Sequence, residues 1–349
     1  MKYFLSALLL LMLVSCLVLH KKDHLTTTPP KTSPETSSVP DTPSPVLPET
    51  ELAGKSYGYP DFYKGIYLNI ATGRNKALLE NFIDKSRKSG INTFVVDVQR
   101  GRRETCEIPE SHVKMMMDKG IHPVARIVCF DQGISRLPLP DDKLERIYKI
   151  TEDTAKAGFK EIQFDYIRFA DKCTTIVDGK PVRMSHTEKY NFIQTLLKTA
   201  RTRVKDYDVR IAADVFGRIP WLSAERHDPI GQKMENFDKV CDVILPMAYP
   251  SHYWHDSASG NNYIATPYKT VLKTSVMARE KTERALIVSW IQAFQLKIKP
   301  SGLTYDKYIE EQIRACHDAE ISGFIMWNAR QDYRVPFDVM KKYYKVETD

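Results

Sequence analysis

Two stretches decide the predicted fold: E-I-Q-F-D-Y-I-R-F (161–169) and V-R-I-A-A-D-V-F-G (209–217). In each, an aspartate closes an apolar run at what looks like the end of a buried strand. Such runs are typical of parallel strands that are buried on both faces. A buried carboxylate without partners costs several kcal/mol, so Asp165 and Asp214 fit best where a strand leaves the core. Barrel enzymes carry their functional groups at strand ends of this kind.

Outward from these two strands, short apolar runs alternate with longer amphipathic segments and form eight pairs. The predicted strands are 65–70, 93–98, 122–130, 161–167, 209–216, 243–248, 285–290 and 323–327. The predicted helices are 77–89, 111–119, 143–157, 188–204, 230–240, 267–280, 308–319 and 337–344. Eight such pairs predict an α/β fold, a (β/α)8 TIM barrel that forms one domain over 60–349. A doubly wound sheet is disfavoured, because no glycine-rich phosphate loop follows the first strand.

The N-terminal part has a different composition. Residues 1–24 contain an apolar run that includes Leu13-Val14-Ser15-Cys16, an order that resembles the lipobox of bacterial lipoproteins, with Cys16 as the lipidated residue. An uncleaved signal-anchor helix is the alternative, since the run stays apolar past Cys16. Residues 25–59 are rich in Pro, Thr and Ser and predict a disordered tether. Both interpretations predict a membrane-anchored protein of the cell envelope that faces the periplasm or the cell exterior.

Composition argues against several other classes of protein. The formal charge of +7 is spread along the chain and is not interleaved with aromatic residues, so nucleic acid is not expected as a partner. Five cysteines follow Cys16; none has metal-ligand spacing, and an odd number argues against a complete disulfide framework. We expect no metal and no cofactor. The sequence does not indicate an oligomeric state.

Polar and aromatic residues gather at the ends of the predicted strands, where the barrel fold would bring them together. Four tryptophans lie at or just beyond strand ends, and the flat face of an indole suits the C–H face of a sugar ring. The pattern therefore favours a carbohydrate as partner. The candidate substrate-binding residues are Asp97, Arg126, Tyr166, Arg168, Tyr249, His252, Tyr253, Trp290, Trp327 and Asn328.

Several stretches resemble a family of glycosyl hydrolases with an α-amylase-like barrel that is known as a domain of unknown function. They are A-R-I-V-C-F (125–130), G-F-K-E-I-Q-F-D-Y-I-R-F (158–169), A-A-D-V-F-G (212–217), I-G-Q (230–232), P-M-A-Y-P-S-H-Y (246–253), S-W-I-Q-A-F (289–294) and M-W-N (326–328). The resemblance implies a (β/α)8 barrel that hydrolyses glycosidic bonds in an envelope or extracellular polysaccharide.

Glycoside hydrolysis needs a carboxylate as nucleophile or base and a carboxylic acid as proton donor. The resemblance implies these catalytic roles for Asp165 and Asp214, with Asp165 as nucleophile beside Arg126 or Arg168. Apolar neighbours of Asp214 would raise its pKa and suit a general acid. The reverse assignment stays open, as do a retaining or an inverting mechanism and a role for Asp97 as the acid.

Three segments depart from the pattern of the resembled family. Gln99–Arg103 stands where an acidic stretch is usual, the loop 131–140 is short, and Ala293 replaces an aspartate. These departures leave an alternative open, in which the chain is an envelope lipoprotein that binds carbohydrate on the same barrel without cleaving it.

Overall fold

The structure is a computed structural model that describes residues 57–101 and 103–347. Cys16, the predicted signal segment and the predicted tether up to residue 56 lie outside the described residues and stay predictions. Within the described ranges, no helix is both long enough and apolar enough to cross a membrane.

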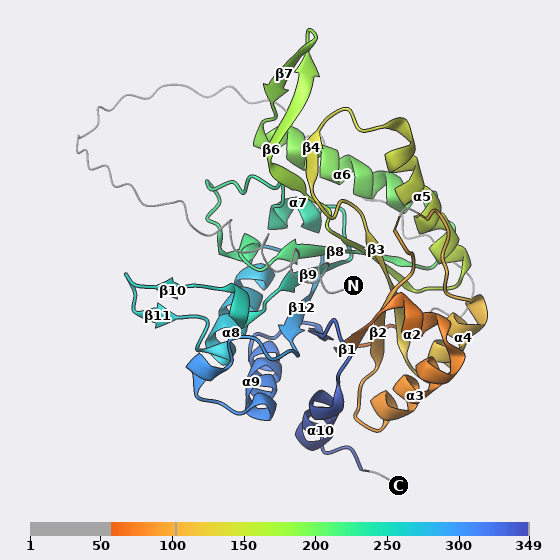
Figure 1. Cartoon of the computed structure of the whole chain (residues 1–349), viewed down its shortest axis with the longest axis vertical. Coiled ribbons are helices and arrows are strands. Elements are labelled where there is room, and N and C mark those ends of the chain that lie inside the picture. The colour runs from red at the N-terminus through yellow and green to blue at the C-terminus, as the bar shows by residue number, and fades with distance from the viewer. Residues whose placement is uncertain (1–56, 102, 348–349) are drawn as a thin grey trace, which may run out of the picture. The chain divides into compact units, whose positions relative to one another are not determined.

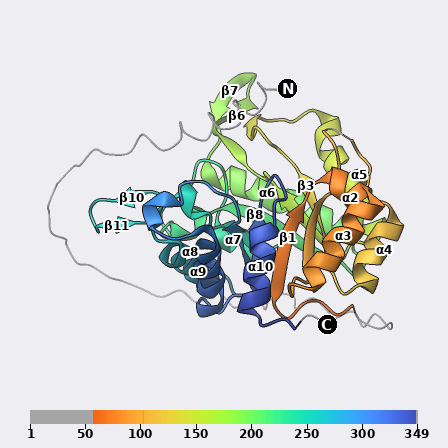
Figure 2. The same cartoon turned by 60° about the horizontal axis from the view of Figure 1, so that its bottom comes forward.

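Eight parallel strands close into a barrel (Figures 1 and 2), which confirms the predicted fold class. The last strand pairs with the first, with Tyr63 in register with Gly323. Gly323 has φ 141°, and a Cβ there would lie 2.3 Å from the Tyr63 carbonyl oxygen, so the closing seam requires glycine. In chain order the barrel strands are β1 (Tyr63–Leu68), β2 (Thr93–Asp97), β3 (His122–Val128), β5 (Glu161–Asp165), β8 (Arg210–Phe216), β9 (Val243–Met247), β12 (Leu286–Gln292) and β13 (Gly323–Trp327).

Helices surround the barrel, as expected for strand–helix repeats (Figure 1). Residues on the outer face of the strands, such as Phe94, Ile162 and Ile244, pack against them in one continuous core. The helices are α2 (Ile70–Arg74), α3 (Lys76–Arg87), α4 (Glu110–Asp118), α5 (Asp141–Lys156), α6 (His186–Arg203), α7 (Met234–Asp238), α8 (Pro267–Arg279), α9 (Tyr305–Asp318) and α10 (Arg334–Tyr343).

The barrel interior is packed with side chains rather than hollow. A second apolar cluster fills it, with Val95, Val124, Leu245 and Trp290 all at most 1% exposed. Because side chains alternate along a strand, the inward positions above this layer are the ones that open at the C-terminal mouth.

The N-terminal end of the barrel is closed by polar contacts. Tyr63 donates a hydrogen bond of 2.8 Å to Glu161, and Arg210 donates one of 2.8 Å to the Tyr63 hydroxyl. Tyr57 and Tyr59, which composition assigned to the tether, pack here: the Tyr57 hydroxyl lies 3.1 Å from His122 Nδ1, and Tyr59 donates to the Lys160 carbonyl. The folded domain therefore includes residues before 60.

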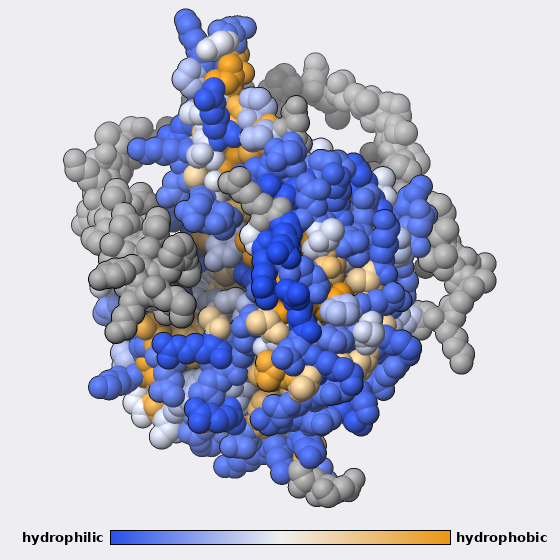
Figure 3. All heavy atoms as spheres, turned by 45° about the vertical axis from the view of Figure 1, so that its right-hand side comes forward, coloured by the Kyte–Doolittle hydropathy of each residue, from blue (hydrophilic) through white to orange (hydrophobic). Residues whose placement is uncertain are grey.

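Two small sheets extend from the barrel. The strands β4 (Ile134–Arg136), β6 (Phe169–Val177) and β7 (Lys180–Arg183) form one, and β10 (His255–Asp256) with β11 (Asn261–Asn262) forms the other. The β6–β7 hairpin projects from the body of the molecule (Figure 1), and Figure 3 shows apolar residues on it among largely hydrophilic surroundings.

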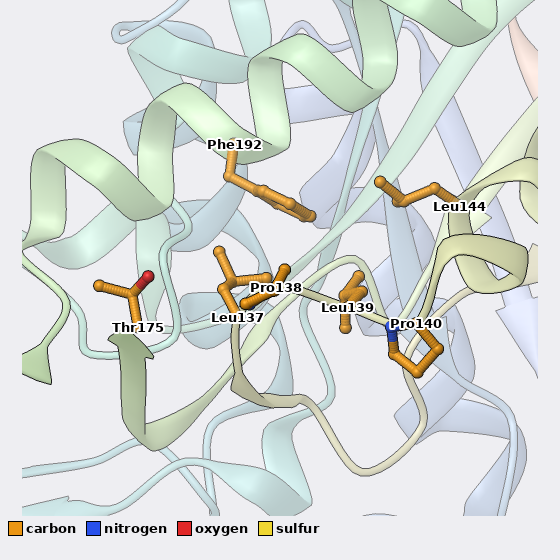
Figure 4. Close-up of a pocket in the computed structure, with 7 residues that line it drawn as sticks. All are labelled: Leu137, Pro138, Leu139, Pro140, Leu144, Thr175 and Phe192. Atoms are coloured by element: carbon orange, nitrogen blue, oxygen red, sulfur yellow. The ribbon is translucent and has the colours of Figure 1, made fainter. Parts of the chain in front are cut away.

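A groove of about 470 Å³ lies outside the barrel, between the β4 segment and helices α5 and α6 (Figure 4). No carboxylate lines it, so it is not a candidate for hydrolytic chemistry. Its lining residues are Leu137, Pro138, Leu139, Pro140, Leu144, Thr175 and Phe192.

Candidate active site

The two aspartates that dominate the sequence lie side by side at the C-terminal end of the barrel. The β5–β8 ladder pairs Phe164 with Ala213, so Asp165 and Asp214 follow at the next position of each strand. Neighbouring strands lie ~4.8 Å apart, and both side chains point inward, which brings the two carboxyl groups close together. Both side chains are nearly closed off from solvent, with Asp165 4% exposed and Asp214 1% exposed.

Arg126 on β3 binds two of the predicted carboxylates at once. Its Nε and Nη2 donate to Asp165 Oδ2 at 2.9 and 2.5 Å, and its Nη1 donates to Asp97 Oδ1 at 2.5 Å. The guanidinium is buried, and its carbon lies 5.2 Å from the centre of the Trp327 ring. Tyr67 adds a hydrogen bond of 2.5 Å to Asp97 Oδ2. A single cation thus holds Asp97 and Asp165 in fixed positions.

Asp214 has no cation in direct contact among the described residues. Gln163 Nε2 donates to its two oxygens at 2.7 and 2.8 Å, and the indole Nε1 of Trp290 donates to Oδ1 at 2.7 Å. Burial, and then the charge of Asp165, raise the pKa of Asp214 well above its ordinary value. The site of Asp214 therefore favours the protonated form of its carboxyl.

The Gln163 side chain is only half satisfied by Asp214. Its Nε2 donates to both oxygens of Asp214, while its Oε1 is buried without a hydrogen-bond partner among the described residues. Gln163 lies one inward position before Asp165 on β5, so the same strand provides a carboxylate and the amide that serves its neighbour.

We expect Asp214→Asn to make the protein more stable than wild type as the pH rises. The folded-state pKa of Asp214 lies above the value of the unfolded chain, so folding favours the protonated form. That contribution is fully present below the ordinary pKa of 3.8 and is lost as pH rises through the folded-state pKa. Asparagine carries no such group, and its side-chain oxygen can still accept from Gln163 Nε2 and Trp290 Nε1.

Urea unfolding of wild type and Asp214→Asn between pH 4 and 8 measures this effect. The difference in free energy of unfolding should grow with pH in favour of the variant. A difference that is constant over this range would mean that Asp214 ionises as it does in the unfolded chain.

Gln232 is a supporting residue that the sequence interpretation did not single out, although it ends the I-G-Q stretch. Its Oε1 accepts from the Phe216 backbone N–H at 2.9 Å. Its Nε2 donates to the carbonyls of Ile167 and Asp214 at 3.3 and 3.2 Å. The side chain is 1% exposed and ties the ends of β5 and β8 together. Gln232 thereby fixes the two carboxylate-bearing strands relative to each other.

Tyr166 and Tyr249 lie beside the carboxylate pair, as predicted. The Tyr166 N–H donates to Asp165 Oδ1 at 2.6 Å, and its φ of 53° is a left-handed conformation that a tyrosine adopts at some cost. Burial, followed by the charges of Asp214 and Asp165, raises the pKa of Tyr249 well above its ordinary value. Both phenol groups thus lie next to the two carboxyl groups as neutral side chains.

Three predicted substrate-binding residues have structural positions instead. Trp290 is 1% exposed inside the barrel, where its indole N–H serves Asp214. Tyr253 is buried and its hydroxyl donates to the Gly217 carbonyl. Asn328 uses its amide nitrogen on the carbonyls of Ala293 and Asp332. Position at a strand end does not tell an open mouth from the packed layer below it, and substrate binding by these three residues stays a prediction.

The remaining aromatic residues divide in the same way. His252 is exposed, with its Nδ1 3.0 Å from Ser251 Oγ. Trp221 donates to Thr274 and packs edge-on against Trp254. Of the four tryptophans, Trp254 is the one that presents a large exposed surface, at 41%.

Fold and site together define a (β/α)8 barrel whose C-terminal end holds three aspartates around a buried arginine. The model of a family described as "Putative glycosyl hydrolase domain" matches residues 138–333, and the chain belongs to this family. Membership of this family implies a carbohydrate as the substrate. A comparison with curated protein sequences found no match.

Solved structures with a similar fold include several glycosidases. The glycoside hydrolase domain of PgaB (BpsB) from Bordetella bronchiseptica has 12% identity and a TM-score of 0.55, covering 80% of this chain and 99% of that domain. The spore cortex-lytic enzyme SleL from Bacillus cereus has 11% identity and a TM-score of 0.53, covering 83% and 75%. The catalytic domain of β-amylase from Paenibacillus polymyxa has 10% identity and a TM-score of 0.52, covering 83% and 100%. At these identities the likeness shows the fold.

Proposed function

We propose that this chain hydrolyses glycosidic bonds in a polysaccharide and that Asp165 and Asp214 carry the reaction. The observation that carries the proposal is their pairing at one level of adjacent strands, with different partners. Asp165 lies against the Arg126 guanidinium, whereas burial raises the pKa of Asp214 and favours its protonated form. Two neighbouring carboxyl groups in opposite protonation states are what acid-assisted glycoside cleavage requires.

In this proposal the reaction proceeds with retention of anomeric configuration. Asp165 attacks the anomeric carbon while Asp214 gives its proton to the departing glycosidic oxygen, leaving a covalent glycosyl-enzyme. Water then attacks that carbon as its bond to Asp165 breaks, Asp214 takes a proton from the water, and Asp165 leaves as the free carboxylate. Retaining enzymes place the two carboxyl groups about 5 to 5.5 Å apart, which is close to the ~4.8 Å spacing of neighbouring strands. Both carboxyls are nearly sealed, so side chains at the mouth have to move when a sugar binds.

The predicted lipoprotein signal and tether favour a polysaccharide of the cell envelope or its surroundings as substrate. The test is release of reducing ends by the full chain from a panel of bacterial envelope and extracellular polysaccharides. We expect release from at least one of them. Binding of a glycan without any release would instead support the non-catalytic carbohydrate-binding protein. The absence of both binding and release would contradict the hydrolase and the carbohydrate-binding protein alike.

A further inference from the structure

One arginine at the mouth of the barrel has a charge that no carboxylate balances. Arg168 follows the end of β5, and within the described part of the chain no carboxylate lies within ion-pair distance of it. Among the described residues its side chain makes one hydrogen bond, from Nη2 to the Asp131 backbone carbonyl at 2.9 Å, and its Nε is shielded from solvent without an acceptor. The side chain thus holds an unmatched charge and an unmet donor.

The position of Arg168 relates it to the carboxylate pair. Its guanidinium carbon lies 5.6 Å from the centre of the Phe216 ring and 5.8 Å from that of Tyr166. Phe216 is two residues after Asp214 on β8 and packs against the core between the strands and the helices. Tyr166 directly follows Asp165. Arg168 therefore lies at the C-terminal end of the barrel, beside the two strands that carry the carboxyls.

A second arginine on the same ring shows the contrast. Arg218 lies 4.9 Å from the Phe216 ring centre, but its Nε and Nη2 donate to the two oxygens of buried Asp228 at 2.6 and 3.0 Å. Of the two guanidinium groups next to Phe216, that of Arg218 has a carboxylate partner and that of Arg168 has none among the described residues. Since Arg126 already serves Asp97 and Asp165, Arg168 is left available to a ligand.

We infer that the substrate carries a carboxylate on a sugar next to the scissile bond and that Arg168 binds it. This inference rests on the proposed function, because it places the substrate over Asp165 and Asp214. A carboxylate can accept two parallel hydrogen bonds from the planar guanidinium, which a single sugar hydroxyl cannot do. The rings of Tyr166 and Phe216 hold the guanidinium in one orientation. The substrate class is therefore an acidic, uronate-containing glycan.

The test compares each acidic oligosaccharide with its carboxyl-reduced form, in which the acid has become a primary alcohol. Oligogalacturonate, alginate and hyaluronan oligosaccharides serve as probes, and binding is measured by calorimetry on the full chain carrying Asp165→Asn, which removes turnover. We expect one acidic form to bind about 30-fold more tightly than its reduced form. Arg168→Gln should bring that ratio close to one, and Arg168→Lys should give an intermediate ratio because it keeps the charge without the fork.

Arg330→Gln is the matched control, because Arg330 is an exposed residue after β13 and the substitution removes the same charge. It should keep the ratio. Equal binding of acidic and reduced forms, no binding of any acidic probe, or a ratio that survives Arg168→Gln would each overturn the inference. Hydrolysis is scored separately on the wild-type chain. Cleavage of a neutral glycan without preference for an acidic one would support the proposed function and overturn this inference. Binding of an acidic glycan that depends on Arg168, with no cleavage of any glycan, would support the inference and contradict the proposed function.

Discussion

Asp165→Asn should reduce hydrolysis by a factor on the order of 10⁴ while glycan binding changes little. The amide keeps the shape of the side chain but cannot attack the anomeric carbon, so the step that forms the glycosyl-enzyme is lost. The readout is release of reducing ends under initial-rate conditions, next to affinity for the same glycan.

The structure provides a reason to expect that the variant folds. Arg126 keeps its ion pair with Asp97 at 2.5 Å, and an asparagine oxygen can still accept from the guanidinium. The thermal midpoint should therefore stay close to that of wild type. A variant that retains wild-type turnover would remove Asp165 from the mechanism, and one that loses activity together with its folded structure would leave Asp214→Asn to test the pair.

Arg126→Met should cause the largest loss of stability of any single substitution at this site, about 3 to 5 kcal/mol. Methionine fills much of the volume but leaves Asp97 and Asp165 buried without their shared cation. Removing one partner of a buried ion pair is costly because the other charge stays in a poorly solvated place. Chemical denaturation of wild type and variant measures the difference in free energy of unfolding.

A double-mutant comparison tells charge from packing. Arg126 also lies over the Trp327 and Tyr67 rings, so part of the loss can come from lost contact with these rings. If unpaired charge dominates, Asp165→Asn should recover stability in the Arg126→Met background. No recovery would show that the guanidinium acts here mainly as a packing group.

The sequence allowed the barrel to be predicted because each repeat carries its own local signal. All eight strands and the eight predicted helices exist, with β13 at its predicted bounds. Two errors have local causes. The first strand ends at Leu68 because Asn69 caps a short helix, accepting from the Thr72 N–H at 2.9 Å. Helix α7 begins only at Met234, because Gly231 has φ 76° and Gln232 turns inward to bind the strand ends.

The β6–β7 hairpin was missed although the sequence contains its signal. Asp178-Gly179 follows a run of four β-branched residues (174–177), and both positions have positive φ, 50° and 73°. That pair is the preferred two-residue turn between antiparallel strands. The hairpin lies outside the repeating strand–helix pattern, because it belongs to an insertion between β5 and α6.

The candidate site was predictable as far as the alternation of side chains allows. Asp97, Arg126, Asp165 and Asp214 occupy inward positions at strand ends, and the structure brings them together. What could not be predicted is the height of each residue around a staggered barrel. The choice of Arg126 over Arg168 as the partner of Asp165 depends on that height, as does the burial of Trp290 beneath Asp214.

Chemical rescue of Asp165→Gly tests the central claim most directly. Removing the carboxylate leaves space beside Arg126, where azide can enter and attack the anomeric carbon while Asp214 protonates the departing oxygen. On a glycan that the wild-type chain cleaves, the account predicts that the variant is inactive alone and that azide restores turnover. The product would then be a glycosyl azide whose anomeric configuration is opposite to that of the substrate. Turnover by Asp165→Gly at the wild-type rate without azide, with release of the free sugar, would contradict the account.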